Sequence, residues 1–218
     1  MLHKTKKYYD LLELFEQENC PLCMLKDKWV SDFIETFLYE GVNDRKMRKK
    51  IQANGGFCYT HAHAMMDHGD PLAHGILYSV LIDEYISSPS FSEPEKKQFM
   101  NKNHIKKTEC LICELERNSD INTVRTFLDF FENSPEFVQK FSDTKTCLCK
   151  PHTDILKTVT KNKELIQKVT DVQKENLIYL KGCLDEIVRK HDYRYKGEAL
   201  TDEERLAWQR AVRLMVGL

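Results

Sequence analysis

The sequence predicts an all-α protein. We expect a duplicated helical bundle with two metal sites, a long helix in the second half and a closing helix at the C-terminal end. Apolar residues recur at helical spacing almost throughout, and no run alternates with a period of two for long enough to indicate a strand. A Cys-x-x-Cys pair followed at long range by a Cys-x-x-His pair occurs twice, with 34 and 35 residues between the two pairs.

The first half contains five predicted helical segments. They cover residues 8–15, 24–38 and 45–50, then run from Cys58 onward and from Leu72 to Ile86. Gly41 is suited to end the second segment, because glycine readily adopts the left-handed conformation that closes many helices. Asn43 or Asp44 can cap the short basic helix. Asp70 followed by Pro71 has the pattern of an N-cap with proline in the first turn.

The second half repeats several features of the first. Thr36-Phe37-Leu38 recurs ninety positions later as Thr126-Phe127-Leu128, and Ser134-Pro135 starts a short helix. The stretch 165–188 is expected to form one long helix. Ser87 to Ser92 has the composition of a linker, and Ser92 with Pro94 restarts a helix. We therefore predict a first metal-binding repeat over residues 1–88, a second over 92–196 and a closing helix over 197–218.

The closing helix carries a capping box, formed by Thr201 and Glu204. Its apolar stripe is expected to pack on other helices, with the opposite face in solvent; an exposed stripe would instead indicate a docking or dimerisation face. The stripe consists of Trp208, Ala211, Val212 and Met215. The face expected in solvent holds Glu203, Arg210 and Arg213.

The paired motifs predict two Cys3His metal sites, most simply two zinc ions per chain. Two cysteines separated by two residues can turn both sulfur atoms toward one ion, and a second pair completes a tetrahedron. Four protein ligands leave no position for water, which is typical of a structural site. Lys26, Lys28 and Lys150 lie near the motifs and can offset the excess thiolate charge. The eight candidate ligands are Cys20, Cys23, Cys58, His61, Cys110, Cys113, Cys149 and His152.

The equal spacing within the halves predicts that each Cys-x-x-Cys pair shares an ion with the Cys-x-x-His of its own half. An exchange, in which Cys20 and Cys23 meet Cys149 and His152, is the alternative. Cys147 is a second candidate for the place of Cys149, because it lies only two residues away. Cys183 falls within the long predicted helix and is expected to be a packed thiol.

A further group of polar residues follows His61. It consists of His63, Asp67, His68 and His74. His63 and Asp67 are four residues apart, so they share one helix face and can form an acid–base pair or hold a second metal. The corresponding positions of the second half lack these residue types. The interpretation we favour is therefore that they are surface groups or hydrogen-bonding partners of a metal ligand.

Composition limits the classes of protein that this chain can be. Its 218 residues are 41% apolar and 31% charged, with a net charge of −1, which is typical of a globular protein and gives no general attraction to nucleic acid or an acidic membrane. The N-terminal stretch has no apolar run typical of a signal peptide. We therefore expect reduced, metal-bound cysteines in the cytoplasm. A basic run, Arg45 to Lys50, can meet phosphates but is more commonly a solvated helix face.

The chain resembles an uncharacterised bacterial family of unknown function. The resemblance rests on Cys20-Pro-Leu-Cys23, the three later Cys motifs, Asp192-Tyr193-Arg194 and Trp208, and it implies no activity. Three function classes follow. The first is a zinc-binding scaffold that binds or regulates a partner without catalysis; the sequence does not identify the partner, and a protein is one candidate. The alternatives are an iron–sulfur or thiol-redox protein and a metal-dependent hydrolase that uses His63, Asp67, His68 and His74.

Overall fold

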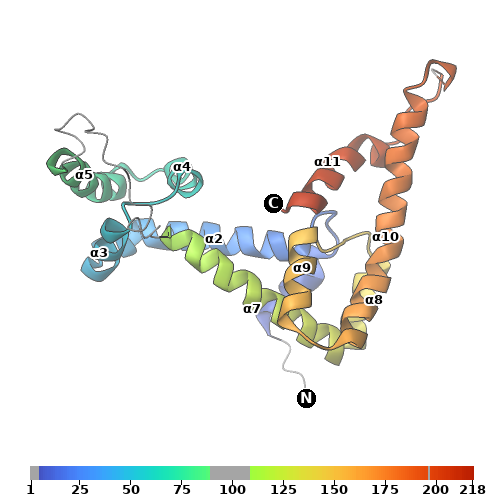
Figure 1. The fold of residues 1–218 in the computed structure, drawn as a ribbon, viewed down its shortest axis with the longest axis horizontal. Coiled ribbons are helices and arrows are strands. Elements are labelled where there is room, and N and C mark those ends of the chain that lie inside the picture. Colours follow the sequence, from blue (N-terminus) through green and yellow to red (C-terminus); the bar gives the residue numbers. More distant parts are fainter. Residues whose placement is uncertain (1–4, 89–108, 196) are drawn as a thin grey trace, which may run out of the picture. The chain divides into compact units, whose positions relative to one another are not determined.

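The computed structural model describes residues 5–88, 109–195 and 197–218, and these residues form helices without a single strand (Figure 1). The predicted all-α class is therefore confirmed. The α-helices are α1 (Lys6–Leu14), α2 (Pro21–Tyr39), α3 (Arg45–Ala53), α4 (Tyr59–His68), α5 (Pro71–Ser87), α7 (Leu111–Asn133), α8 (Pro135–Asp143), α9 (Lys150–Val159), α10 (Lys163–Lys190) and α11 (Asp202–Val216). Two short 3-10 helices are η1 (Gly41–Asn43) and η2 (Tyr193–Tyr195).

Several helix starts follow the local signals of the sequence, whereas Gly41, predicted to end the second segment in the left-handed conformation, lies in η1 and has no positive φ. The Asp44 carboxylate accepts hydrogen bonds from the backbone of Lys46 and Met47 and starts α3, and that of Asp70 accepts from Ala73 and starts α5. Thr201 and Glu204 form the predicted capping box of α11. These contacts satisfy backbone N–H groups that have no partner within the first helical turn. Most of the predicted linker and the helix restart at Ser92 and Pro94 lie outside the described residues.

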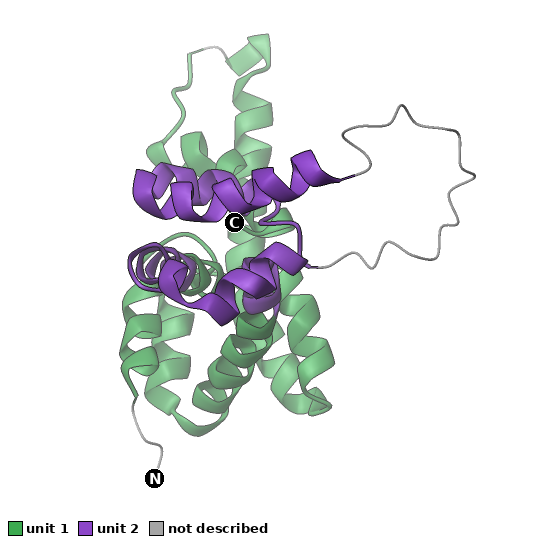
Figure 2. Ribbon diagram, turned by 90° about the vertical axis from the view of Figure 1, so that its left-hand side faces the viewer, with its two compact units in different colours: residues 1–27, 118–218 green, residues 28–117 purple. Residues whose placement is uncertain are grey.

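The chain forms two compact units, which Figure 2 shows in different colours. Unit 1 comprises residues 1–27 and 118–218, and unit 2 comprises residues 28–117. This division differs from the predicted one into 1–88, 92–196 and 197–218. The boundaries fall within α2 and within α7, so the predicted repeats do not correspond to the compact units.

Unit 1 is built around a cluster of buried aromatic rings. Phe15 and Phe137 have ring centroids 5.0 Å apart, and Phe127 and Phe141 have centroids 5.4 Å apart at an angle of 75°. Such edge-to-face contacts stabilise a core beyond the area that they bury. The Tyr8 hydroxyl lies 2.9 Å from the Ser134 hydroxyl, which in turn caps α8. The N-terminal helix is thereby fixed to the second half of the sequence.

Unit 2 has a smaller core. Among the described residues, 12 buried residues form it, against 22 in unit 1. Its centre contains Ile34 and Phe37 of α2, Ile51 of α3 and Met65 of α4. Unit 2 is also the shorter of the two units, so its core is similar to that of unit 1 in proportion to the residues described.

Helix α11 packs on α9 and α10, but through a different face from the predicted one. Ala207, Arg210 and Leu214 are buried, whereas Trp208 is 56% exposed and Met215 is 61% exposed. The predicted orientation is therefore wrong. The reason is polar: the Arg210 guanidinium turns inward and donates a hydrogen bond to the Lys145 carbonyl group, which an apolar stripe cannot do. An exposed apolar stripe is the arrangement expected if this face of α11 serves in docking or dimerisation, the alternative stated above.

This orientation predicts that two substitutions by alanine in α11 lower the free energy of unfolding by unequal amounts. Leu214→Ala removes a buried side chain and is expected to lower the free energy of unfolding by about 2–5 kcal/mol. Trp208→Ala removes a larger side chain that is mostly in solvent, so a loss below about 1 kcal/mol is expected. Denaturant unfolding of the metal-loaded variants measures both. A larger loss for Trp208→Ala would show that the stripe is buried after all.

Candidate metal centres

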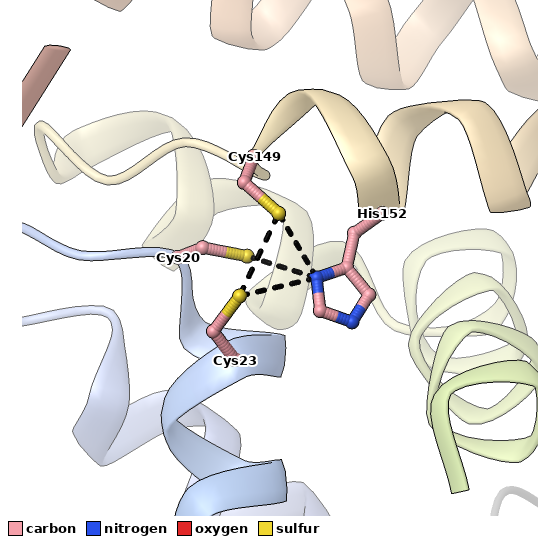
Figure 3. Close-up of side chains that lie close together, drawn as sticks. All are labelled: Cys20, Cys23, Cys149 and His152. Carbon is pink, nitrogen blue, oxygen red and sulfur yellow. Dashed lines mark hydrogen bonds between the residues drawn. The ribbon is translucent and has the colours of Figure 1, made fainter. Parts of the chain in front are cut away.

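The first site lies in unit 1 and consists of Cys20, Cys23, Cys149 and His152 (Figure 3). Cys20 immediately precedes α2 and Cys23 lies in its first turn, while Cys149 caps α9 and His152 lies in its first turn. The three sulfur atoms and the Nδ1 atom of the imidazole point toward one another. Nδ1 lies 3.5, 3.4 and 3.1 Å from the sulfur atoms of Cys20, Cys23 and Cys149. All four residues are buried.

The second site lies in unit 2 and consists of Cys58, His61, Cys110 and Cys113. It has the same construction, because Cys58 caps α4 and the Cys110–Cys113 pair stands at the start of α7. The His61 Nδ1 atom lies 3.2, 3.6 and 3.4 Å from the sulfur atoms of Cys58, Cys110 and Cys113. Unlike the first site, it includes two half-buried ligands, Cys58 and Cys113.

The spacing of the donor atoms fits one tetrahedral ion at each site. Bond lengths of about 2.3 Å to sulfur and about 2.0 Å to nitrogen imply tetrahedral edges of about 3.8 Å between sulfur atoms and about 3.5 Å between sulfur and nitrogen. The Cys23 and Cys149 sulfur atoms are 3.6 Å apart, and those of Cys58 and Cys113 are 3.7 Å apart. The structure therefore has two Cys3His groups that can hold a metal ion.

The ligands are exchanged between the halves, so the predicted pairing within each half is wrong. Cys20 and Cys23 meet the second Cys-x-x-His motif, and Cys110 and Cys113 meet the first. The division into compact units accounts for this. Cys20 and Cys23 fold in unit 1 together with the second Cys-x-x-His motif, whereas Cys110 and Cys113 fold in unit 2 together with the first.

In the first site the candidate ligands hold protons among themselves, which a bound metal ion would displace. Burial lowers the pKa of His152, but hydrogen bonds with the Asp120 carboxylate and two sulfur atoms outweigh it and raise that pKa to about 11. Burial raises the pKa of Cys20 well above its usual range, whereas hydrogen bonds with Cys149 and Cys20 lower that of Cys23. The sulfur atoms thus share protons and negative charge. A divalent cation among them offsets the repulsion that three buried thiolates would otherwise suffer.

Two carboxylates of α7 orient the histidines, and the sequence analysis missed both. The His152 Nε2 atom lies 3.3 Å from Asp120 Oδ1, and the His61 Nε2 atom lies 3.2 Å from Glu116 Oε2. Such contacts fix the tautomer that presents Nδ1 to a metal. The signal was present for the second site, since Glu116 follows Cys113 by three residues and so shares its helix face. Asp120 serves a histidine 32 residues away, which no local pattern reveals.

These carboxylates predict site-specific losses of metal affinity. Asp120→Asn is expected to weaken the first site by about 10–100-fold, because the amide no longer holds the imidazole as an anionic acceptor. Glu116→Gln is the matched change at the second site. Competition with a chelator of known affinity measures both variants. Equal weakening of both sites in either variant would contradict the assignment.

Cys147 and Cys183 belong to neither group. Cys147 is fully buried, and burial raises the pKa of its thiol to about 11. Its neighbour Leu148 donates a backbone hydrogen bond of 3.1 Å to the buried Gln173 side chain of α10. Cys147 therefore packs within the segment that positions Cys149, and Cys183 is a half-buried thiol packed against the core of unit 1.

The residues of the hydrolase alternative do not converge. Within the described residues, no group of three metal-binding side chains includes any of His63, Asp67, His68 or His74. His68 lies 3.8 Å from Glu35, and the His74 Nδ1 atom donates to the Asp70 carbonyl group of its own helix start. His63 and His74 line a surface hollow to which neither Asp67 nor His68 contributes.

Comparison with known proteins confirms the resemblance. The chain belongs to DUF6062, a family of unknown function whose sequence model matches residues 9–218. It is 30% identical over 208 residues to an "Uncharacterized 23.9 kDa protein in xynA 3'region" of Caldicellulosiruptor sp. (strain Rt8B.4), covering 95% of this chain and 99% of the relative. No solved structure matches. No helix in the described part of the chain has the length and apolar character needed to cross a membrane.

Proposed function

We propose that this chain is a zinc-binding helical scaffold that binds or regulates a partner, without catalysis of its own. The observation that carries the proposal is the completeness of the two ligand sets. Each offers three thiolates and one imidazole at the edges of a tetrahedron, so a bound ion has no open position for water or substrate. The ions serve to tie distant helices together, as structural zinc does in small domains.

The geometry favours a single ion over an iron–sulfur cluster at each site. In a cluster the thiolates are divided among several iron atoms, so they lie farther apart than on one ion. Here all four donor atoms of each set lie within 4.8 Å of one another. Three thiolates and an imidazole suit zinc, a borderline-soft ion that prefers tetrahedral sites.

The state of the cysteines supports a cytoplasmic location. All eight are free thiols in the structure, which suits a reducing compartment where metal-binding thiolates persist. A protein partner is the class we expect, because the net charge of −1 gives no general attraction to nucleic acid or an acidic membrane.

Metal analysis of natively purified protein tests this proposal. We expect close to two zinc ions per chain and no absorbance in the visible range. A brown protein that contains iron and labile sulfide would establish the cluster alternative instead. A preparation that neither carries zinc nor takes it up at micromolar concentration would refute the scaffold proposal.

A further inference from the structure

The two sites differ in how far solvent reaches their sulfur atoms. In the first site Cys20, Cys23 and Cys149 are 3%, 1% and 0% exposed. In the second site Cys58 and Cys113 are only half-buried. A reagent can react with a thiolate only if it reaches the sulfur atom. A reagent in solution is therefore expected to react with the second site faster than with the first.

From this asymmetry we propose that Cys58 and Cys113 form a thiol-oxidation site, at which a peroxide closes a disulfide and releases the ion of the second site. The first site keeps its ion under the same conditions. The inference rests on the metal-binding function proposed above, and gives one of the two sites a sensing role.

The cover of the first site comes from the end of α11. Gly217 closes this helix with a φ of 88°, and a Cβ atom at that position would lie 3.9 Å from the Cys23 sulfur atom and 4.0 Å from that of Cys149. The backbone N–H of Leu218 donates a hydrogen bond to Cys23. This contact withdraws charge from the sulfur, and the chain itself blocks approach to it.

The sites also differ in the charged residues around their histidines. In the first site Lys26 lies 3.8 Å from Asp120, the carboxylate that orients His152. The two cysteine pairs are ninety residues apart, and the residue ninety positions after Lys26 is Glu116. Glu116 is the carboxylate that orients His61. A lysine near the first site therefore corresponds to a carboxylate at the second.

The reaction needs one peroxide and two thiolates. One of the two sulfur atoms attacks the O–O bond and becomes a sulfenic acid, while hydroxide leaves. The other sulfur atom, 3.7 Å away, then attacks the S–OH group, displaces a second hydroxide and forms the disulfide. The peroxide has accepted two electrons from the two thiolates. Zinc keeps its oxidation state, loses two of its four ligands and dissociates; a dithiol reductant reverses the disulfide.

The test uses full-length protein whose content of two zinc ions has been measured beforehand. Hydrogen peroxide is added in the presence of a coloured zinc chelator, and remaining thiols are alkylated for mass spectrometry. We expect one ion to leave at least roughly tenfold faster than the other, together with a disulfide between Cys58 and Cys113. Cys20, Cys23 and Cys149 should still be reduced at that time, and dithiothreitol with zinc should restore the second ion.

A variant that lacks Gly217 and Leu218 provides the matched control. It uncovers the first site without touching the second, so the slow ion should leave faster while the fast ion is unaffected; circular dichroism checks that the variant is folded. Release of both ions at one rate, or oxidation of Cys20, Cys23 or Cys149 first, would overturn the proposal. If the protein bound no zinc, the metal analysis that precedes this test would already show it. A failure of the metal-binding proposal is thereby distinguished from a failure of the oxidation proposal.

Discussion

Removal of both metal ions with a strong chelator is expected to unfold helices α3, α4 and α5 of unit 2 first and to lower the melting temperature of the remaining structure markedly. Structural zinc contributes apparent binding free energies of about 10–16 kcal/mol in small domains. The net stability of a whole domain is about 5–15 kcal/mol. Because the ligands come from segments far apart in the sequence, this binding energy is available only to the folded chain.

The order of unfolding follows from the smaller size of unit 2 and from the greater exposure of its site, because a smaller domain is less stable on its own. Unit 2 has 12 buried residues among those described, whereas unit 1 has 22 and a cluster of aromatic rings. The second site is also the more exposed of the two. Unit 2 therefore loses its ion sooner and retains less to hold its helices once the ion is gone.

Circular dichroism and hydrogen exchange with mass spectrometry measure this result. Peptides from α3, α4 and α5 should lose protection before those from α8 and α10, and zinc in slight excess should restore both. If a chelator strips both ions and thermal stability is unchanged, the sites are not structural. If unit 1 lost protection first, the core of unit 1 would depend on its metal ion more strongly than the size of that core suggests.

The sequence was sufficient to predict most of the local structure of this protein. Helix starts at Asp44, Asp70, Ser134 and Thr201 could be recognised because a capping side chain acts on backbone groups within three residues. The eight residues of the two metal groups were likewise visible, since each motif places two donors on one turn. Both kinds of signal depend on contacts between near neighbours in the chain.

The pairing of the motifs and the orientation of α11 could not be predicted in the same way. Equal spacing is compatible with ligands from one half or from both, and only the way in which the chain divides into compact units decides between them. In α11 the apolar stripe suggested that the face with Trp208 is buried. The opposite face is buried instead, and from it Arg210 donates a hydrogen bond to the Lys145 carbonyl group. Both outcomes depend on contacts between residues that are 49 or more positions apart in the sequence, for which periodicity carries no information.

The exchanged pairing predicts which double variants lose one zinc ion and which lose two. Cys23→Ser and Cys149→Ser remove ligands of the same site, so the double variant is expected to keep one ion and to melt where either single variant melts. Cys23→Ser combined with Cys58→Ser damages both sites. It is expected to lose both ions and to be much less stable than either single variant, because the two losses are independent.

Zinc is counted by native mass spectrometry in the presence of a competing chelator that removes weakly held ions. Cys147→Ser is the control, since this thiol lies near the first site but outside it, and both ions should be retained. Pairing within the halves would give the opposite result. The variant with Cys23 and Cys58 replaced would then keep one ion, and the variant with Cys23 and Cys149 replaced would keep none.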